Sequence, residues 1–252
     1  MTLTKTLKTK LLLGILAAAL SLSLAIGGTL MFFSDDSGPA TNVVTLDNAE
    51  IQLWESDGSS GAQQIGDSYD AEDQIEGYTY KDGAFSGIDF GEVVPGATLG
   101  KEPYVVNSGD IPVYVYVDGS ITVKSADGAE VDYDELSDEV KTQIAAILAT
   151  VGGDDLGSNE YAKWVGTETA VVDGAITGTY YLVDATGALY ALPAGDPTPN
   201  IFESVTIPFE TVDNTLSGYE ITLTLTAYAA QSENNTATDI DDLKALFDTV
   251  AE

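Results

Sequence analysis

The sequence predicts an all-β protein: a jelly-roll-like antiparallel sandwich with one inserted amphipathic helix and one C-terminal helix. Three observations support this prediction. After Asn42, short segments of alternating or β-branched residues recur, with turn residues between them. No strand–helix–strand rhythm is present, so a parallel sheet is not indicated. The 252 residues include no cysteine, so a core must hold the fold together without disulfides.

The first predicted strands lie in the N-terminal half of this region. Segment 42–55 alternates, and its inward candidates are Val44, Leu46, Ala49, Ile51 and Leu53. Segment 56–87 is rich in Gly, Ser and Asp and is expected to be a long surface loop. Further strands are expected at 90–94, 102–107 and 111–117, and a Ser-Gly-Asp turn is expected to join the last two as a hairpin.

Two segments have helical spacing instead. In the first, near 132–151, Leu136, Val140 and Ile144 recur at intervals of four, and Gly-Gly follows. In the second, at the C-terminus, Asp239 is the expected N-cap of an amphipathic helix. Between the two helices the pattern predicts strands at 161–165, 179–183, 188–192, 201–209 and 219–229, the second and third of them paired.

Charge is divided sharply along the chain. Lys5, Lys8 and Lys10 precede the first acidic residue, Asp35. After Met31 there are six lysines and all 41 Asp and Glu residues, which give that part a formal charge of −35. Such a field repels nucleic acid and anionic lipid, so neither is an expected partner. It fits either plain solubility or a role that depends on salt or divalent cations.

The motifs of catalysis are missing from the sequence. The chain has no histidine, no metalloprotease motif, no phosphate-binding loop and no nucleophile elbow. Acidic clusters occur at 67–73, 132–138 and 239–242, but none has EF-hand spacing, so solvated faces and helix N-termini are the favoured interpretation. We therefore predict no catalytic residue and no cofactor, and calcium is the one ligand left open.

The N-terminal 31 residues are typical of an export signal. A lysine-rich start is followed by the apolar run LLLGILAAALSLSLAIGG, which ends in small residues. Signal cleavage is expected between Met31 and Phe32. The alternative is a retained anchor, because the apolar stretch 11–33 is long enough to cross a bilayer.

The beginning of the chain, KTKLLLGILAAALSLSLAIGGTLMFFSDDSGPATNVVTLDNAEIQLWE, resembles the TasA/camelysin family of exported biofilm-matrix fibre proteins, which carry a SipW-type signal peptide. The later stretches VVPGATLGKEPYVVNSGDIPVYVYV, IFESVTIPFE and YEITLTLTAYAAQSE are similar to strand patterns of the same family. The resemblance covers both ends and much of the middle, but not segment 56–87 or the inserted helix.

The resemblance implies a jelly-roll domain over residues 45–252 and a donor-strand segment over residues 32–44. After signal removal, the donor would add as a strand to the next subunit, so that copies of the chain form a head-to-tail filament. The donor residues that it implies are Phe32, Phe33, Ser34, Asp35, Val43 and Val44. The implied partners are other copies of the chain, a signal peptidase and an accessory matrix or anchoring protein, outside the cell or at its surface.

Two other functions are weighed against a fibre subunit. One is a secreted monomeric adhesin or carbohydrate-binding sandwich that uses some of the 13 tyrosines as stacking surfaces. Tyr114 and Tyr116 alternate with valines, which is more typical of a sheet face than of a ligand platform. The other is a camelysin-like metalloprotease, which the absence of histidine disfavours, because zinc proteases typically use histidine ligands.

Overall fold

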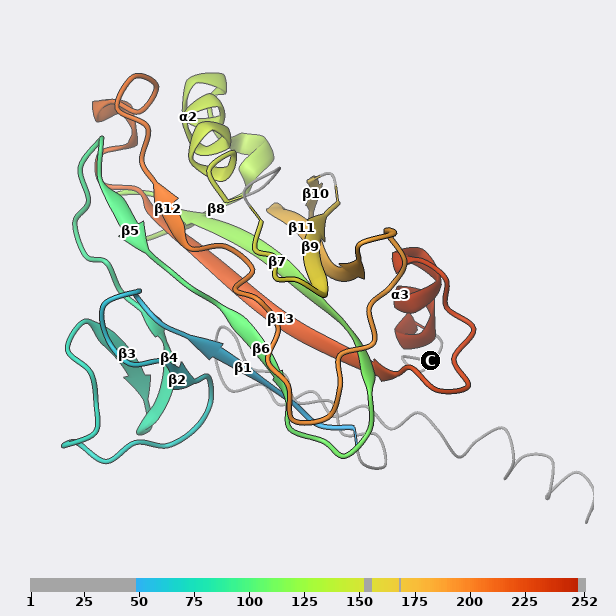
Figure 1. Ribbon diagram of the computed structural model, residues 1–252. Coiled ribbons are helices and arrows are strands. Elements are labelled where there is room, and N and C mark those ends of the chain that lie inside the picture. Colours follow the sequence, from blue (N-terminus) through green and yellow to red (C-terminus); the bar gives the residue numbers. More distant parts are fainter. Residues whose placement is uncertain (1–48, 152–155, 168, 249–252) are drawn as a thin grey trace, which may run out of the picture.

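The computed structural model describes residues 49–151, 156–167 and 169–248 (Figure 1). These residues are mostly β, their paired strands are antiparallel, and two α-helices pack on the sheets. The strands are β1 (Ile51–Glu55), β2 (Gln63–Gln64), β3 (Tyr78–Lys81), β4 (Ala84–Ile88), β5 (Thr98–Gly100), β6 (Tyr104–Asn107), β7 (Val113–Lys124), β8 (Glu130–Val131), β9 (Ala162–Gly166), β10 (Ala170–Val172), β11 (Ala175–Asp184), β12 (Ser204–Thr206) and β13 (Glu220–Gln231). The helices are α2 (Asp138–Leu148) and α3 (Ile240–Asp248), with 3-10 turns η1 (Tyr133–Glu135) and η3 (Asn214–Leu216). The expected boundaries after residues 31 and 44 lie outside the described part.

The larger sheet is built around β7. Apolar residues alternate along this strand, so one of its faces is buried: Val113, Val115, Val117, Ile121 and Val123. β7 pairs with β13 on one side and with β11 on the other. β9 and β10 both pair with β11, and β8 pairs with the end of β7. β7, β9, β11 and β13 therefore present rows of side chains to the same buried face, whereas the three residues of β10 are exposed.

A second layer covers the end of this face that carries Val113 to Val117. In it, β1 lies between β2 and β6, and residues 196–201 extend the layer beyond β6 through bonds such as Thr198 N–H to Val105 C=O. Ala49, Ile51 and Leu53 are buried in one cluster with the valines of β7, which confirms them as inward residues. The main core lies between the two layers, while Val44 and Leu46 fall outside the described residues.

Helix α2 covers the other end of the buried face. The Ser137 hydroxyl caps the helix by accepting a hydrogen bond from the Val140 N–H. Val140 and Ile144 pack against Ile121 of β7 and Ile176 of β11 in a second apolar cluster. The prediction of an inserted amphipathic helix is confirmed, and the helix covers a part of the sheet that the second layer leaves open.

Helix α3 packs on the opposite face of the larger sheet. Its Leu243 is fully buried, and Phe247 meets the rings of Tyr116 and Tyr228 edge-on. Those two tyrosines stack across β7 and β13 with 4.7 Å between ring centroids. Asp239 accepts a bond from the backbone N–H three residues later, which confirms it as the N-cap.

The prediction of a loop over 56–87 is wrong, because this segment contains β2, β3 and all but the last residue of β4, and β3 and β4 form a hairpin. Asp82 and Gly83 at the hairpin tip have φ of 55° and 88°, as a two-residue type I′ turn requires. Tyr78 stacks on Phe85 at 5.0 Å and both rings are buried. The Asp-Gly turn and the aromatic residues beside it were visible in the sequence, but the surrounding Gly, Ser and Asp concealed them.

Two further expectations are corrected in the next segment. Residues 90–94 form no strand, and Val94 is 67% exposed; the strand β5 starts only after the turn at Gly96. β6 and β7 do not form a hairpin, because β6 pairs with β1 in one layer and β7 with β11 and β13 in the other. The fully buried Asn107 donates to the carbonyls of Ile111 and Leu192, and these bonds hold the chain where it crosses between layers.

The remaining strand predictions are confirmed to different extents. Those at 161–165 and 219–229 correspond to β9 and β13, and 179–183 lies within β11. Segment 188–192 contributes only isolated bridges to β11 and β7, and 201–209 retains only the short strand β12. Ile201 and Phe202 are buried in the main core without regular strand pairing, so burial alone explains why they are apolar.

Candidate assembly surface

Within the described part of the chain, β13 is an edge strand along its whole length. All twelve of its residues pair with β7, from Glu220 opposite Lys124 to Gln231 opposite Val113. Within the described residues, no strand pairs with its other side. Figure 1 shows β13 as the long orange strand that crosses the molecule beside β7. An edge of this length is a template on which a further strand can form hydrogen bonds.

The backbone groups on the outer side of this edge can be assigned. The N–H of Ser232, just after β13, donates to the C=O of Pro112, just before β7, at 3.1 Å. Antiparallel pairs alternate between bonded and non-bonded, so even-numbered residues of β13 point their backbone groups toward β7. The outward groups therefore belong to the odd-numbered residues: Ile221, Leu223, Leu225, Ala227, Ala229 and Gln231. From Ile221 to Ala229 they take part in no hydrogen bond between described residues.

Among the residues that the structure describes, β13 lacks the features that usually protect an edge strand. Natural edges are blunted by lysine, proline, bulges or shortness, and β13 is long, regular and without charge after Glu220. The other side of the sandwich is closed by the chain itself. There the Trp164 indole donates to Pro199 C=O at 2.8 Å, and the Gly157 N–H donates to Ile201 C=O at 3.0 Å. The two sides of the sandwich therefore differ in their capacity to accept a strand.

The face of β13 that points away from the core is rich in hydroxyl groups. The neighbours of Thr222, Thr224 and Thr226 on β7 are Thr122, Ser120 and Asp118, in that order. On the next strand, β11, Thr177 lies opposite Ser120 and Thr179 lies opposite Asp118. At one end of this array the Lys244 ammonium donates to the carboxylate of Asp118 and to the Thr179 hydroxyl. The array is a second surface feature, and it does not involve the free backbone edge.

Tyr114 and Tyr116, which were expected to lie on a sheet face, differ in exposure. Tyr116 is only 2% exposed, because it lies under α3 and beside Tyr228. Burial raises the pKa of the Tyr228 phenol, and the carboxylate of Asp118 raises it further. Tyr114 is half-buried at the margin of the same cluster. Because Tyr116 is part of a packed cluster, the pair offers no open aromatic platform.

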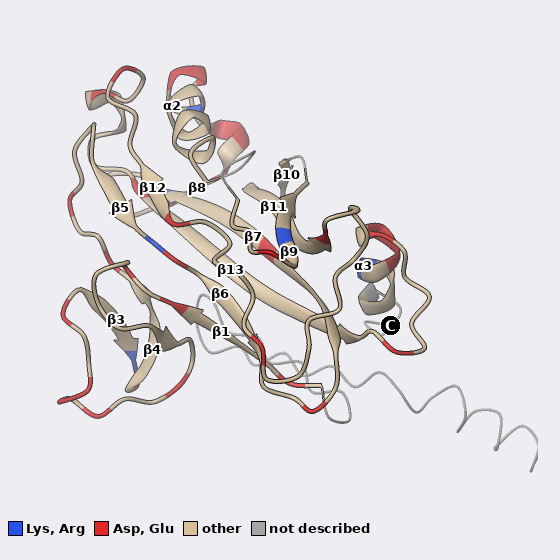
Figure 2. Cartoon of the chain, viewed as in Figure 1, with Lys and Arg blue, Asp and Glu red and all other residues tan. Residues whose placement is uncertain are grey.

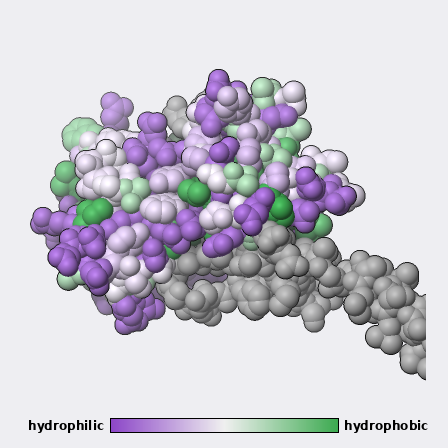
Figure 3. All heavy atoms as spheres, turned by 60° about the horizontal axis from the view of Figure 1, so that its bottom comes forward, coloured by the Kyte–Doolittle hydropathy of each residue, from purple (hydrophilic) through white to green (hydrophobic). Residues whose placement is uncertain are grey.

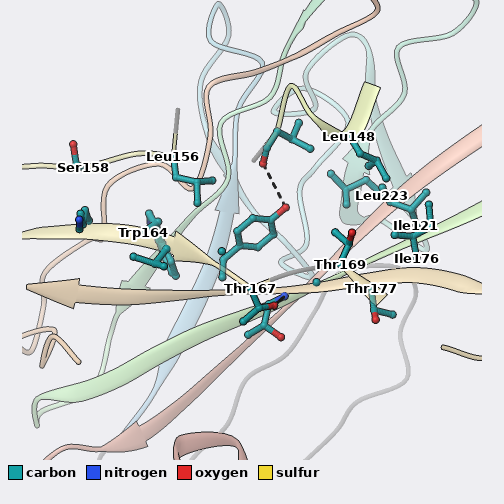
Figure 4. A pocket seen from close by; sticks show the side chains of 18 residues that line it. Ile121, Leu148, Leu156, Ser158, Trp164, Thr167, Thr169, Ile176, Thr177 and Leu223 are labelled. Carbon is teal, nitrogen blue, oxygen red and sulfur yellow. Dashed lines mark hydrogen bonds between the residues drawn. The ribbon is translucent and has the colours of Figure 1, made fainter. Parts of the chain in front are cut away.

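A cavity of about 590 Å³ lies beneath the larger sheet, near the end of α2 (Figure 4). Gly119 and Gly178 face each other across β7 and β11 and leave this space; a Cβ on Gly119 would lie 3.3 Å from the Tyr180 ring. The Tyr180 hydroxyl reaches the carbonyl of Val151 at 3.5 Å, and burial raises the pKa of its phenol. The described lining includes one charged side chain, Lys163, and no carboxylate, so it contains no acid–base pair.

The acidic clusters act as caps and as charged surface. Asp132 accepts from the Asp134 N–H at the start of η1, and Asp242 accepts from the Thr238 N–H and hydroxyl before α3. These bonds lower the pKa of Asp242. Figure 2 shows the acidic residues spread over loops and helix ends. Among the described residues no group of three or more His, Cys, Asp or Glu is placed to hold a metal ion.

The predicted site residues cannot be located in this structure. Met31, Phe32, Phe33, Ser34, Asp35, Val43 and Val44 all lie outside the described residues. The free edge of β13 was missed at the level of sequence. Its twelve residues without lysine or proline were a usable signal, but pairing had to be known before the strand could be assigned to an edge.

Comparison of the chain with protein-family models, curated proteins and solved structures finds no match. No helix in the described part of the chain is long and apolar enough to span a membrane. On the face shown in Figure 3, the described residues are mostly hydrophilic, with scattered hydrophobic ones between them. The free backbone edge of β13 is therefore the feature of the described surface that most directly offers a contact to another chain.

Proposed function

We propose that this protein is a secreted structural subunit of extracellular, biofilm-matrix fibres, and that it polymerises by N-terminal donor-strand exchange. The observation that carries the proposal is the unprotected twelve-residue edge of β13. The residues that follow the expected cleavage site, from Phe32 to Val44, are the proposed donor. The signal peptidase and an accessory anchoring protein belong to the same proposal.

Strand addition at this edge has a clear physical basis. Each outward N–H and C=O of β13 gains a partner, and side chains of the added strand lie beside those of β13 on both faces. Because the donor and the acceptor edge are different parts of the chain, the contact is heterologous and generates an open filament. A protein without disulfides would then be stabilised by its neighbours, since each subunit's edge is covered in the fibre.

The jelly-roll topology is part of the same proposal. The described strands form two facing layers. On one side, the contacts of Gly157 and Trp164 close the sandwich. On the other side, no described strand lies beyond β13. A strand added there would extend the larger sheet. This arrangement supports a jelly roll that is completed by a segment from another subunit.

The experiment compares two purified forms of the exported chain, one that begins at Phe32 and one that begins at Val43. We expect filaments by negative-stain electron microscopy only from the longer form. The matched control is the longer form, beginning at position 32, with both Phe32→Ser and Phe33→Ser. It keeps the length of the donor and loses its apolar anchors, so its filaments should be fewer. Filaments of equal number from both starting points would contradict the donor assignment.

A second function, a monomeric adhesin, is favoured by the hydroxyl array around Thr224 and Ser120. Regularly spaced hydroxyls on a sheet can donate and accept hydrogen bonds to a sugar. If both forms of the chain stay monomeric and a glycan binds, with affinity lost in Thr224→Val, the adhesin replaces the fibre subunit as the proposed function.

A further inference from the structure

The second layer contains one ion pair that is buried from solvent. Lys101, between β5 and β6, donates through its Nζ to Oε1 of Glu55, the last residue of β1. The two side chains are only 10% and 5% exposed. Among the described lysines, Lys101 is the one that is buried. The other described pairs, such as Lys124 with Glu220 at 42% and 60% exposure, lie at the surface.

The backbone itself places the two side chains together. β1 and β6 pair with Leu53 opposite Val105, so Glu55 lies opposite position 103, and Lys101 is its diagonal neighbour on the same face. The alternation of buried residues continues through both positions. The Lys101 N–H donates to Glu203 C=O at 3.1 Å, and the next N–H donates to Ser56 C=O at 2.8 Å. These bonds fix the backbone at Lys101 and beside Glu55, so both side chains start from the same face of the layer.

The chemical state of the pair follows from its burial. Two charges removed from water are costly, and their mutual attraction repays that cost only in part. Burial also lowers the pKa of the Lys101 amine to about 8. The amine is therefore neutral in a larger fraction of molecules than an exposed lysine would be, and removal from water favours the uncharged forms of both partners. A neutral lysine amine is a nucleophile, and close positioning of two reacting groups raises their rate of reaction strongly.

We infer that Lys101 and Glu55 condense to form an isopeptide bond between β1 and the segment that precedes β6. The lone pair of Nζ attacks Cδ of Glu55, and one C–O bond of the tetrahedral intermediate breaks. The departing hydroxyl takes the proton that the nitrogen loses, so an ammonium and a carboxylate become an amide and one molecule of water. No oxidant or co-reactant is needed. The product places one neutral amide where two buried charges stood.

The bond would close a covalent loop between residues 46 positions apart. The loop contains β2, β3, β4 and β5, and it limits the unfolded chain as a disulfide would, in a protein that has no cysteine. The isopeptide bond does not depend on the assembly of the protein into fibres. If either proposal fails its test, the other is unaffected.

The test is the mass of the purified exported protein, after its N-terminus has been determined. We expect the measured mass to be lower than the sequence mass by the mass of one water molecule. After digestion with a protease that cleaves after lysine, cleavage at Lys101 should be lost. The peptide that runs from residue 82 to Lys124 should remain joined to the peptide that ends at Lys81.

Two variants assign the bond to its residues. Lys101→Arg keeps the positive charge but not the nucleophilic amine, so its mass should equal its full sequence mass. Lys124→Arg, in the exposed pair, should keep the deficit. A wild-type protein of full mass that is cleaved after Lys101 overturns the inference, and so does a deficit that persists in Lys101→Arg. The wild-type measurement decides the outcome even if Lys101→Arg folds poorly.

Discussion

Single polar side chains anchor the connections between the regular elements of this fold. The amide of Gln143 on α2 donates to Oδ1 of Asp213 at 2.8 Å and accepts from the Asp213 N–H at 3.0 Å. Asp213 also accepts from the Thr215 N–H at 2.8 Å at the start of η3. Gln143 is only 3% exposed, so its amide would be costly to leave without a partner. One side chain thus ties α2 to the turn before β13.

The first prediction concerns the charge of Asp213. The backbone bond from Thr215 is the largest cause of its lowered pKa, followed by side-chain bonds from Thr215 and Gln143. A carboxyl whose folded pKa is lower than its unfolded pKa stabilises the protein above the unfolded value, and that contribution is lost as the pH falls through the folded pKa. We expect wild type to be more stable than Asp213→Asn at pH 6, with a gap that narrows below about pH 4.

The measurement is urea unfolding of both proteins over this range of pH. The difference between them is the useful quantity, because the general effect of acid on a highly charged chain acts on both. A gap that is constant with pH would mean that the charge of Asp213 does not contribute to stability.

At the level of elements, strand β13 contributes side chains to both the buried core and the outer face of the sheet. In β13 the side chains on one face, such as Leu225 and Ala227, are buried in the core, whereas Thr224 and Thr226 lie on the opposite face. The backbone adds a third property, because the odd-numbered residues direct their N–H and C=O groups away from β7. Surface chemistry therefore belongs to the even-numbered residues, whereas core packing and strand addition share the odd-numbered ones.

The second prediction concerns the outward N–H groups of this edge. Ala227→Pro removes one of them and leaves the bonds to β7 in place, and proline is tolerated on edge strands. The Ala227 side chain is fully buried, so the ring must also fit into the core, and the variant should be somewhat less stable than wild type. One lost hydrogen bond is worth about 1 kcal/mol, and the ring also obstructs the incoming strand. We therefore expect the critical concentration for filament growth to rise at least about fivefold, as measured by sedimentation of assembled protein.

The matched control is Ala227→Gly, which keeps the N–H and should still form filaments. Circular dichroism establishes that both variants are folded. A sharper form of the test mixes Ala227→Pro with the chain that begins at Val43. One has a donor without an open acceptor, and the other has an acceptor without a donor, so pairs should form and filaments should not. Unchanged filament growth by Ala227→Pro alone would exclude this edge as the acceptor.

For the whole molecule, the large negative charge opposes any association between copies of the chain. The region after Met31 has a formal charge of −35, so each subunit of the proposed filament would lie against others of the same sign. Figure 2 shows how widely the acidic side chains are distributed over the described chain. Repulsion of this kind keeps the protein soluble and slows contact between its copies. Its range is set by the salt concentration.

The third prediction is that salt accelerates filament growth. Raising sodium chloride from about 0.01 M to about 0.15 M shortens the Debye length from about 30 Å to about 8 Å. We expect the elongation rate, followed by light scattering, to rise by at least about tenfold because encounter rates between charged molecules vary by this order. Calcium chloride at matched ionic strength separates screening from specific calcium binding, and growth that slows in salt would contradict the prediction.

The sequence by itself determined the local features of this protein. Alternation predicted the inward residues of β1 and the alternating strand that became β7. The helical period predicted α2 and α3, the latter with its N-cap Asp239. These predictions succeed because the period of the side chains and the capping bonds depend on residues within a few positions. The β3–β4 hairpin also belongs to this group, since Asp82-Gly83 is a local turn signal that was overlooked.

Only the tertiary structure decided which strands are neighbours. It separated β6 and β7 into two layers, left β13 at an edge, and brought Lys101 against Glu55. The two-residue repeat of a strand shows which of its faces is buried, but it says nothing about which other strand pairs with it. That choice depends on contacts between residues far apart in the chain, which compete over the whole molecule, and for this reason both proposed sites became visible only once the sheets were assembled.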